Sequence, residues 1–284
     1  MPLTTLKTAL SSLLAGMILL ATVPAMGADS AVTPPAALET GYRQMYNLDF
    51  DGAHTVFRAW EASHPDDPIG PVSNAAAYLF AEFNRLHILE SELFIDNDRF
   101  ARREKQVPDP QARAAFDREL ARSDEIASRI LSGSPQDGNA IFAKVMADGL
   151  RGDYAAMIEK RNVAGLGYMK AGRLLAQKLL AQDPSYYDAY LAVGIENYLL
   201  GLNSAPVRWL LRMGGAETNK QDGIAKLRIT AEKGRYLAPY ARLLLAVAAL
   251  RDRDRETARQ LLSGLADEFP QNQLYRKELA RLAP

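Results

Sequence analysis

The sequence contains no cysteine. Disulfide bonds, redox chemistry through thiols and a lipid-modified amino-terminal cysteine are therefore excluded. The chain must fold through its core alone, and it avoids disulfide mispairing in an oxidising compartment. We expect a protein that is stable outside the cytoplasm without covalent cross-links.

The sequence also lacks an excess of either charge. Lysine and arginine together number 34, as do aspartate and glutamate, so no overall field attracts nucleic acid or an anionic membrane. Hydrophobic residues make up 48% of the chain and charged residues 24%, which is typical of a folded globular protein. We therefore expect no nucleic-acid partner.

Residues that carry catalysis or bind metals are scarce. There are three histidines, and no G-x-S-x-G, H-E-x-x-H or phosphate-loop motif occurs. His87 and Glu90 are one helical turn apart, but Asn84 stands where a di-iron helix carries glutamate, so a hydrogen-bonded or solvated helix face is preferred. We predict no enzymatic activity, no cofactor and no metal site.

A glycine string, "AGLGYMKAG", contains Gly165, Gly167 and Gly172 but has a helical context. Dinucleotide fingerprints need a preceding strand, which is missing here. We interpret these glycines as small residues that allow a neighbouring helix to approach closely.

The amino terminus has the pattern of a secretory signal peptide. Lys7 is followed by the uncharged run "TALSSLLAGMILLATV" and then by small residues. The run is short for a membrane crossing of roughly 20 residues, although a retained anchor stays an alternative. Cleavage after Ala25 or Gly27 satisfies the small-residue requirement.

The segmentation that follows is residues 1–27 as signal peptide, 28–36 as an extended proline-containing leader, and 37–284 as one helical domain. After cleavage we expect no stable membrane insertion. The expected location is the periplasm or the exterior of the cell.

Strand patterns are nearly absent, and from Leu38 onward apolar residues recur at spacings of three and four. The pattern predicts an all-α fold. The expected helices are Ala36–Tyr46, Phe50–Ser63, Pro71–Ile95, Asp109–Ser132, Gln136–Arg151, Tyr154–Gln182, Tyr186–Leu200, Ala205–Met213, Asn219–Gly234, Ala238–Leu250, Asp254–Glu268 and Asn272–Leu282.

Four of these helices align on the proline that follows each of them, at positions 65, 135, 184 and 270. Twelve residues before each proline stands a small residue, as close packing against a neighbouring helix requires; these are Ala53, Ser123, Gly172 and Ala258. Apolar residues nine and five positions before the proline share one helical face.

This pattern resembles the second helix of a tetratricopeptide (TPR) hairpin, most clearly in "NLDFDGAHTVFRAWEASHPDDP" and "QKLLAQDPSYYDAYLAVGIENYL". The resemblance implies a right-handed superhelix, an α-solenoid of helical hairpins. The prolines are 70, 49 and 86 residues apart, against a repeat of about 34. The array is therefore irregular, and no copy keeps the full consensus of a first helix.

The segment "WLLRMGGAETNKQDGIAKLRITAE" is similar to a TPR subgroup that includes the eukaryotic inclusion-body clearance and mitochondrial outer-membrane members. In that subgroup a glycine-bearing loop joins a helix rich in aromatic and basic residues to a G-x-x-x-L helix. The similarity implies a shared structural insert and not a shared activity.

Aromatic and basic residues in the later half are the candidate binding residues. Tyrosine combines an apolar ring with a hydroxyl that needs a partner, and arginine donates to carboxylates. The predicted set is Tyr187, Tyr190, Asn197, Tyr198, Arg208, Trp209 and Arg212. The alternative is that the tyrosines fill a repeat core and that the arginine helix packs outward.

The preferred function is a binding or scaffold protein that holds a protein or peptide on a concave helical surface. A second hypothesis is a periplasmic small-molecule-binding component that could serve a transporter, which a closed cavity with convergent polar groups would favour over an open groove. An enzyme without a recognisable motif is the third hypothesis. Oligomeric state and partner identity do not follow from the sequence.

Overall fold

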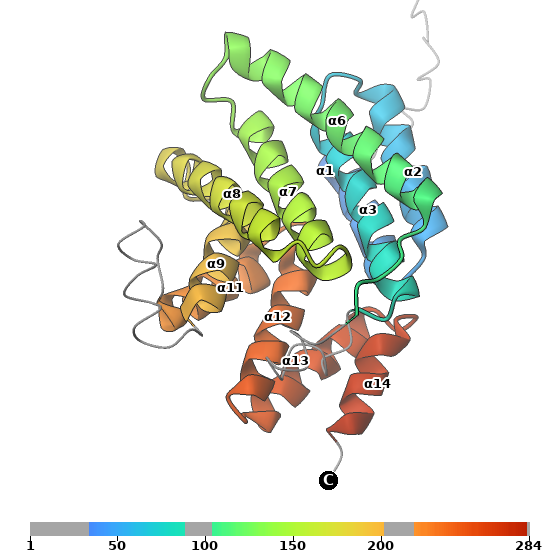
Figure 1. Cartoon of the computed structure of the whole chain (residues 1–284), viewed down its shortest axis with the longest axis vertical. Coiled ribbons are helices and arrows are strands. Elements are labelled where there is room, and N and C mark those ends of the chain that lie inside the picture. The colour runs from blue at the N-terminus through green and yellow to red at the C-terminus, as the bar shows by residue number, and fades with distance from the viewer. Residues whose placement is uncertain (1–33, 89–103, 202–218, 283–284) are drawn as a thin grey trace, which may run out of the picture. The chain divides into compact units, whose positions relative to one another are not determined.

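A computed structural model describes residues 34–88, 104–201 and 219–282, and within these residues the chain forms helices and no strands (Figure 1). The predicted all-α fold is confirmed. Residues 1–33, which hold the predicted signal peptide, and the expected helix Ala205–Met213 lie outside the described residues.

The described helices are α1 (Pro34–Tyr46), α2 (Phe50–Ser63), α3 (Ile69–Arg85), α6 (Pro110–Gly133), α7 (Gly138–Asp153), the π-helix η1 (Tyr154–Ile158), α8 (Asn162–Gln182), the 3-10 helix η2 (Tyr187–Ala189), α9 (Tyr190–Gly201), α11 (Lys220–Lys233), α12 (Ala238–Arg251), α13 (Arg255–Glu268) and α14 (Gln273–Arg281).

Side-chain caps fix where several of these helices begin. The carboxylate of Asp109 accepts hydrogen bonds from the backbone N–H groups of Gln111 and Ala112, and Pro110 occupies the first helical turn, where its missing N–H costs nothing. Asp49, Asp137, Asn219, Asp254 and Asn272 cap their helices in the same way. Polar residues between apolar runs therefore set the helix boundaries.

Three predicted boundaries were wrong. The chain is already helical at Pro34, inside the expected extended leader, because proline is tolerated in a first helical turn. Helix α3 ends at Arg85 and not at Ile95, since His87 adopts a positive φ of 56°. The expected helix Tyr154–Gln182 is interrupted, because Lys160, also at φ 56°, separates η1 from α8.

Consecutive helices pack against each other along the described chain, from α1 with α2 to α13 with α14. The small residues before the four prolines are all buried, as expected; they are Ala53, Ser123, Gly172 and Ala258. A Cβ at Gly172 would lie 3.3 Å from the Cβ of Asp148, so α7 and α8 approach closely there. The prediction of helical hairpins packed through small residues is confirmed.

Helix α1 also contacts residues close to the carboxyl end of the chain. The Tyr46 carbonyl accepts a hydrogen bond from Asn272 Nδ2 (2.8 Å), and the Tyr46 hydroxyl donates to the Tyr236 carbonyl (3.1 Å). The rings of Tyr46 and Phe269 are 5.6 Å apart. In a simple stack of repeats each unit contacts only its neighbours, so these contacts add a second set of constraints and enclose side chains from both ends of the domain.

No helix in residues 34–88, 104–201 and 219–282 combines the length and the apolar character needed to cross a membrane.

Candidate functional site: an apolar cavity

Two adjoining chambers lie among the helices. The larger has a volume of about 460 Å³ and is lined by residues of α3, α7, η1, α8, α9, α11 and α12. The smaller, about 90 Å³, adds residues of α1. Both chambers are lined by Gly152, Asp153, Met169, Ile195 and Tyr240.

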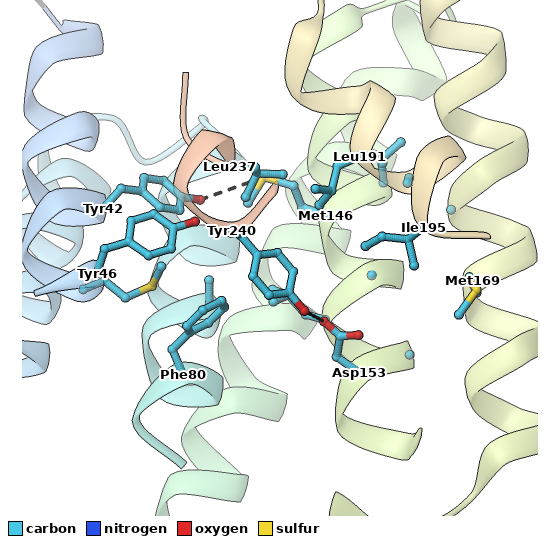
Figure 2. A pocket seen from close by; sticks show the side chains of 18 residues that line it. Tyr42, Tyr46, Phe80, Met146, Asp153, Met169, Leu191, Ile195, Leu237 and Tyr240 are labelled. Atoms are coloured by element: carbon cyan, nitrogen blue, oxygen red, sulfur yellow. Dashed lines mark hydrogen bonds between the residues drawn. The ribbon is translucent and has the colours of Figure 1, made fainter. Parts of the chain in front are cut away.

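The tyrosines around the smaller chamber have hydrogen-bond partners, and Figure 2 shows those of Tyr42 with Met146 and of Tyr240 with Asp153. The Tyr42 hydroxyl pairs with Ser73 Oγ at 3.0 Å, and that of Tyr46 with the Tyr236 carbonyl. Burial raises the pKa of both tyrosines well above its ordinary value. These groups therefore stay neutral, and the chamber wall is effectively apolar.

Asp153 is the acidic residue shared by both chambers. Its Oδ2 accepts a hydrogen bond from the Tyr240 hydroxyl at 3.3 Å, and Figure 2 shows that ring reaching toward it from α12. Burial raises the pKa of Asp153 to about 7, and the hydrogen bond from Tyr240 lowers it only in part. A carboxyl group that changes charge near neutral pH therefore lies where the chambers meet.

Apolar side chains form most of the larger chamber, among them Phe83, Met157, Leu227, Leu243 and Val247. The polar side chains in its lining are Asp153, Asn162, Tyr198, Tyr240 and Arg251. The hydroxyl of Tyr198 is buried and has no hydrogen-bond partner in the described part of the chain. Since buried hydroxyl groups are normally paired, a ligand would supply the missing partner.

Close helix approach shapes the walls of the larger chamber. A Cβ at Gly165 would lie 3.0 Å from the Cβ of Ala156 and 3.2 Å from the Gly152 carbonyl oxygen. The π-helix η1 lies between Gly152 and Gly165 in the chain. At its end the Glu159 N–H donates a hydrogen bond to the Tyr154 carbonyl oxygen, at 3.2 Å. Such π-helical turns often occur at functional sites. Here the turn carries Ala156 and Met157 into the chamber wall.

The larger chamber reaches the protein surface at an apolar rim. Leu166 on α8 and Leu199 on α9 both line it, yet 49% and 42% of their surfaces remain exposed. Exposed leucines beside a cavity are typical of an entrance for apolar molecules. The chamber is thus accessible from the side bounded by α8 and α9.

The structure separates the predicted binding residues. Tyr198 lines the larger chamber, whereas Asn197 is fully buried and donates from Nδ2 to Asp222 Oδ2 at 2.6 Å, which joins α9 to α11. Tyr187 and Tyr190 are half-buried and line neither chamber. Lys233 Nζ lies 5.3 Å from the Tyr187 ring centroid.

Three further predicted residues, Arg208, Trp209 and Arg212, lie outside the described residues. Their role in binding, like that of Tyr187 and Tyr190, stays a prediction.

Sequence reasoning missed Asp153 and Tyr240. Asp153 follows "GLRG" at the end of a helix, where an acidic residue usually faces solvent. One feature of the sequence could have identified it. Asp153 is surrounded along the chain by small residues, which are typical of a helix that packs closely against a neighbour such as α8; these are Gly149, Gly152 and Ala156.

A separate polar cluster, the polar junction, links α2, α3 and α6; it consists of the buried residues His54, Glu61 and Asn74 and the exposed Arg122. Asn74 Oδ1 accepts from His54 Nδ1 (2.6 Å) and Asn74 Nδ2 donates to Glu61 Oε1 (3.0 Å). Arg122 Nη1 donates to Glu61 Oε2 (2.5 Å). The junction lines neither chamber, and its groups satisfy one another, so it serves packing.

Two further polar groups, His64 and Glu82, also have structural partners. His64 stacks on Trp60 with ring centroids 3.7 Å apart. Glu82 accepts hydrogen bonds from Arg85 and from the Asp109 backbone N–H. Within the described ranges, no group of three or more potential ligands is placed to hold a metal ion.

Comparison with known proteins gives one structural likeness. No protein-family model matches the chain. A search of curated proteins found no match. Among solved structures, the chain is similar to a thermophilic TPR protein from Thermus thermophilus, with 17% sequence identity and a TM-score of 0.43; the match covers 88% of this chain and 98% of that one.

Proposed function

We propose that the chain is an exported binding protein that holds a mostly apolar small molecule in the larger chamber. The observation that carries the proposal is the chamber itself, about 460 Å³ in volume, with the buried unpaired hydroxyl of Tyr198 in its wall. Ligand sites commonly have volumes of about 300–1,000 Å³, apolar walls and a few polar groups that orient the ligand.

Export is part of the same proposal and is supported by the amino-terminal sequence. A charged residue, an uncharged run and small residues precede the helical domain, and the chain has no cysteine. Amino-terminal mass spectrometry of the protein from a periplasmic fraction tests it. Mature chains that begin after Ala25 or Gly27 support export, and an intact Met1 in that fraction contradicts cleavage.

A protein partner is the second candidate function, and one surface feature favours it. Val163, Leu166 and Leu174 lie on one face of α8 with 86%, 49% and 51% of their surfaces exposed. Helical-hairpin proteins often bind other proteins through such faces. Tyr187 and Tyr190 remain candidate contacts for such a partner, and the absence of enzymatic activity stays a prediction.

A neutral fluorescent probe, N-phenylnaphthylamine, tests the small-molecule proposal. We expect saturable binding of one probe per purified chain, because its rings fit an apolar chamber of this size. Val247→Trp adds bulk inside the larger chamber and is expected to abolish that binding.

Leu174→Trp is the matched control, since it adds a similar aromatic group on exposed α8 outside both chambers. Binding that Leu174→Trp preserves and Val247→Trp removes supports the chamber as the site. Equal binding by both variants would place the probe elsewhere and reject the proposal.

A further inference from the structure

Asp153, which is half-buried at the cavity, differs from the buried carboxylates of Glu196 and Asp188. Glu196 accepts from Arg173 Nε at 2.9 Å, with both side chains 4% exposed. Asp188 accepts from the backbone N–H groups of Arg235, Tyr236 and Leu237. Each of these carboxylates is therefore compensated by a cation or by several amides.

Asp153 has one hydrogen-bond donor, the Tyr240 hydroxyl at 3.3 Å, and no ion pair with a described residue. The residues that line the smaller chamber include no lysine, arginine or histidine. Arg251 on α12 also lines the larger chamber, where its charge lowers the pKa of Tyr198. A carboxylate in a mostly apolar wall is unfavourable without a paired cation, and no described residue forms an ion pair with Asp153.

The surroundings of Asp153 define what can compensate it. Met169 and Ile195 stand beside it in the wall of both chambers, and Figure 2 shows these side chains on the same side of the cavity. Gly152, next to it, contributes no side chain. A ligand group that compensates the charge of Asp153 must therefore belong to a molecule with an apolar part.

We infer that the ligand is an apolar amine, whose cationic nitrogen binds the Asp153 carboxylate while its hydrocarbon part fills the larger chamber. This inference rests on the proposed function, because it names the ligand class of the same cavity. The apolar rim at Leu166 and Leu199 accepts the hydrocarbon, and the cation replaces the water that Asp153 loses on burial.

The inference predicts a pH dependence. The titratable groups that line the chambers are Asp153 on α7, Tyr42 and Tyr46 on α1, Tyr198 on α9, and Tyr240 and Arg251 on α12. Helices α3, α8 and α11 and the π-helix contribute no titratable side chain to the lining. Burial raises the pKa of each tyrosine, that of Tyr198 to about 12, so the tyrosines stay neutral.

Asp153 is then the lining group that changes charge near neutrality, because its pKa is about 7. An alkylamine keeps its charge there, since its pKa is about 10. Binding should therefore strengthen roughly tenfold from pH 6 to pH 8 as the ionised fraction of Asp153 grows.

Displacement of N-phenylnaphthylamine by decylamine, decanol and decanoate tests the inference on the unaltered chain. The three molecules share their hydrocarbon and differ in head-group charge. We expect decylamine to displace the probe at least tenfold more effectively than decanol at pH 8, and decanoate to be the weakest.

Asp153→Asn removes the charge with little change in shape. It should weaken decylamine binding about thirtyfold, the loss typical of a buried charge pair, and should abolish the pH dependence of that binding, both measured relative to decanol on the same variant. Asp148→Asn, on the same helix but outside both chambers, controls for the change in net charge.

The outcomes separate the two proposals. Probe binding that all three molecules displace equally overturns the amine inference and leaves an apolar binding protein. Absence of probe binding to the unaltered chain overturns both. If Asp153→Asn does not fold, the ligand series and its pH dependence on the unaltered chain still decide.

Discussion

Two carboxylates, Glu61 buried in the polar junction and Asp153 half-buried between the chambers, have opposite surroundings. Glu61 accepts hydrogen bonds from Asn74 and Arg122, at 3.0 and 2.5 Å. Asp153 accepts one, from Tyr240 at 3.3 Å. Burial raises the pKa of both, but only at Glu61 does a cation oppose the shift.

The difference distinguishes a structural polar group from a candidate binding group. Glu61 links three helices, and every partner it needs comes from the chain. Asp153 lies beside a chamber of about 460 Å³, and the described chain leaves its charge uncompensated. A compensated carboxylate stabilises the fold, whereas an uncompensated one costs stability that a ligand can restore.

The largest expected effect is the loss of the polar junction. Asn74→Ala leaves His54 and Glu61 without their shared partner, and Asn74 is only 1% exposed. We expect the free energy of unfolding to fall by about 3 kcal/mol, since buried polar groups would be left unpaired. Urea unfolding at pH 7 measures it, and a loss below about 1 kcal/mol would show that the junction contributes little.

At Asp153 the expected change has the opposite sign. Its pKa in the folded protein is raised from 3.8 to about 7, so its stabilising contribution is complete below pH 4 and is lost as pH rises through 7. The full shift corresponds to about 4 kcal/mol, and partial exposure of the Asp153 side chain roughly halves it, so Asp153→Asn should increase the unfolding free energy at pH 8 by about 2 kcal/mol in the absence of ligand.

Melting temperatures between pH 4 and pH 8 measure this effect. The unaltered chain should become less stable across that range relative to the variant, and the two should converge at the acidic end. Parallel curves would mean that Asp153 titrates as an ordinary surface aspartate.

A smaller effect is expected at the wall of the larger chamber. Gly165→Ala places a Cβ 3.0 Å from the Cβ of Ala156, so α8 must shift by a few tenths of an ångström. The gain in helix propensity offsets part of this cost, which leaves a net loss of about 1 kcal/mol. Gly167→Ala, whose Cβ would meet nothing within 4 Å, is the control and should be neutral or stabilising.

The smallest effect is expected for an exposed ion pair near the polar junction. Arg129 and Asp66 are 2.5 Å apart, but their side chains are 58% and 82% exposed. Arg129→Ala should change the unfolding free energy by less than about 0.5 kcal/mol, because water screens such pairs. If Arg129→Ala lowered the unfolding free energy as much as Asn74→Ala does, burial would not explain the difference between the two sites.

Local patterns in the sequence were sufficient for most helices. Phe50–Ser63 was predicted to the residue, and Asp109, Asp254 and Asn272 cap helices where polar residues precede apolar runs. The breaks at His87 and Lys160 were missed because a positive φ in a residue other than glycine leaves no compositional mark.

The sequence by itself therefore determined the all-α fold and the buried small residues at helix contacts, since both follow from spacing along one chain. It also predicted Tyr198 as a candidate binding residue, through its ring and hydroxyl; Tyr198 lines the larger chamber, and its role in binding stays a prediction. The tertiary structure alone decided that Asp153 and Tyr240, 87 positions apart, meet at a cavity. These two residues meet because the packing of the helices brings α12 to the end of α7. No local periodicity in the sequence encodes a contact between such distant positions.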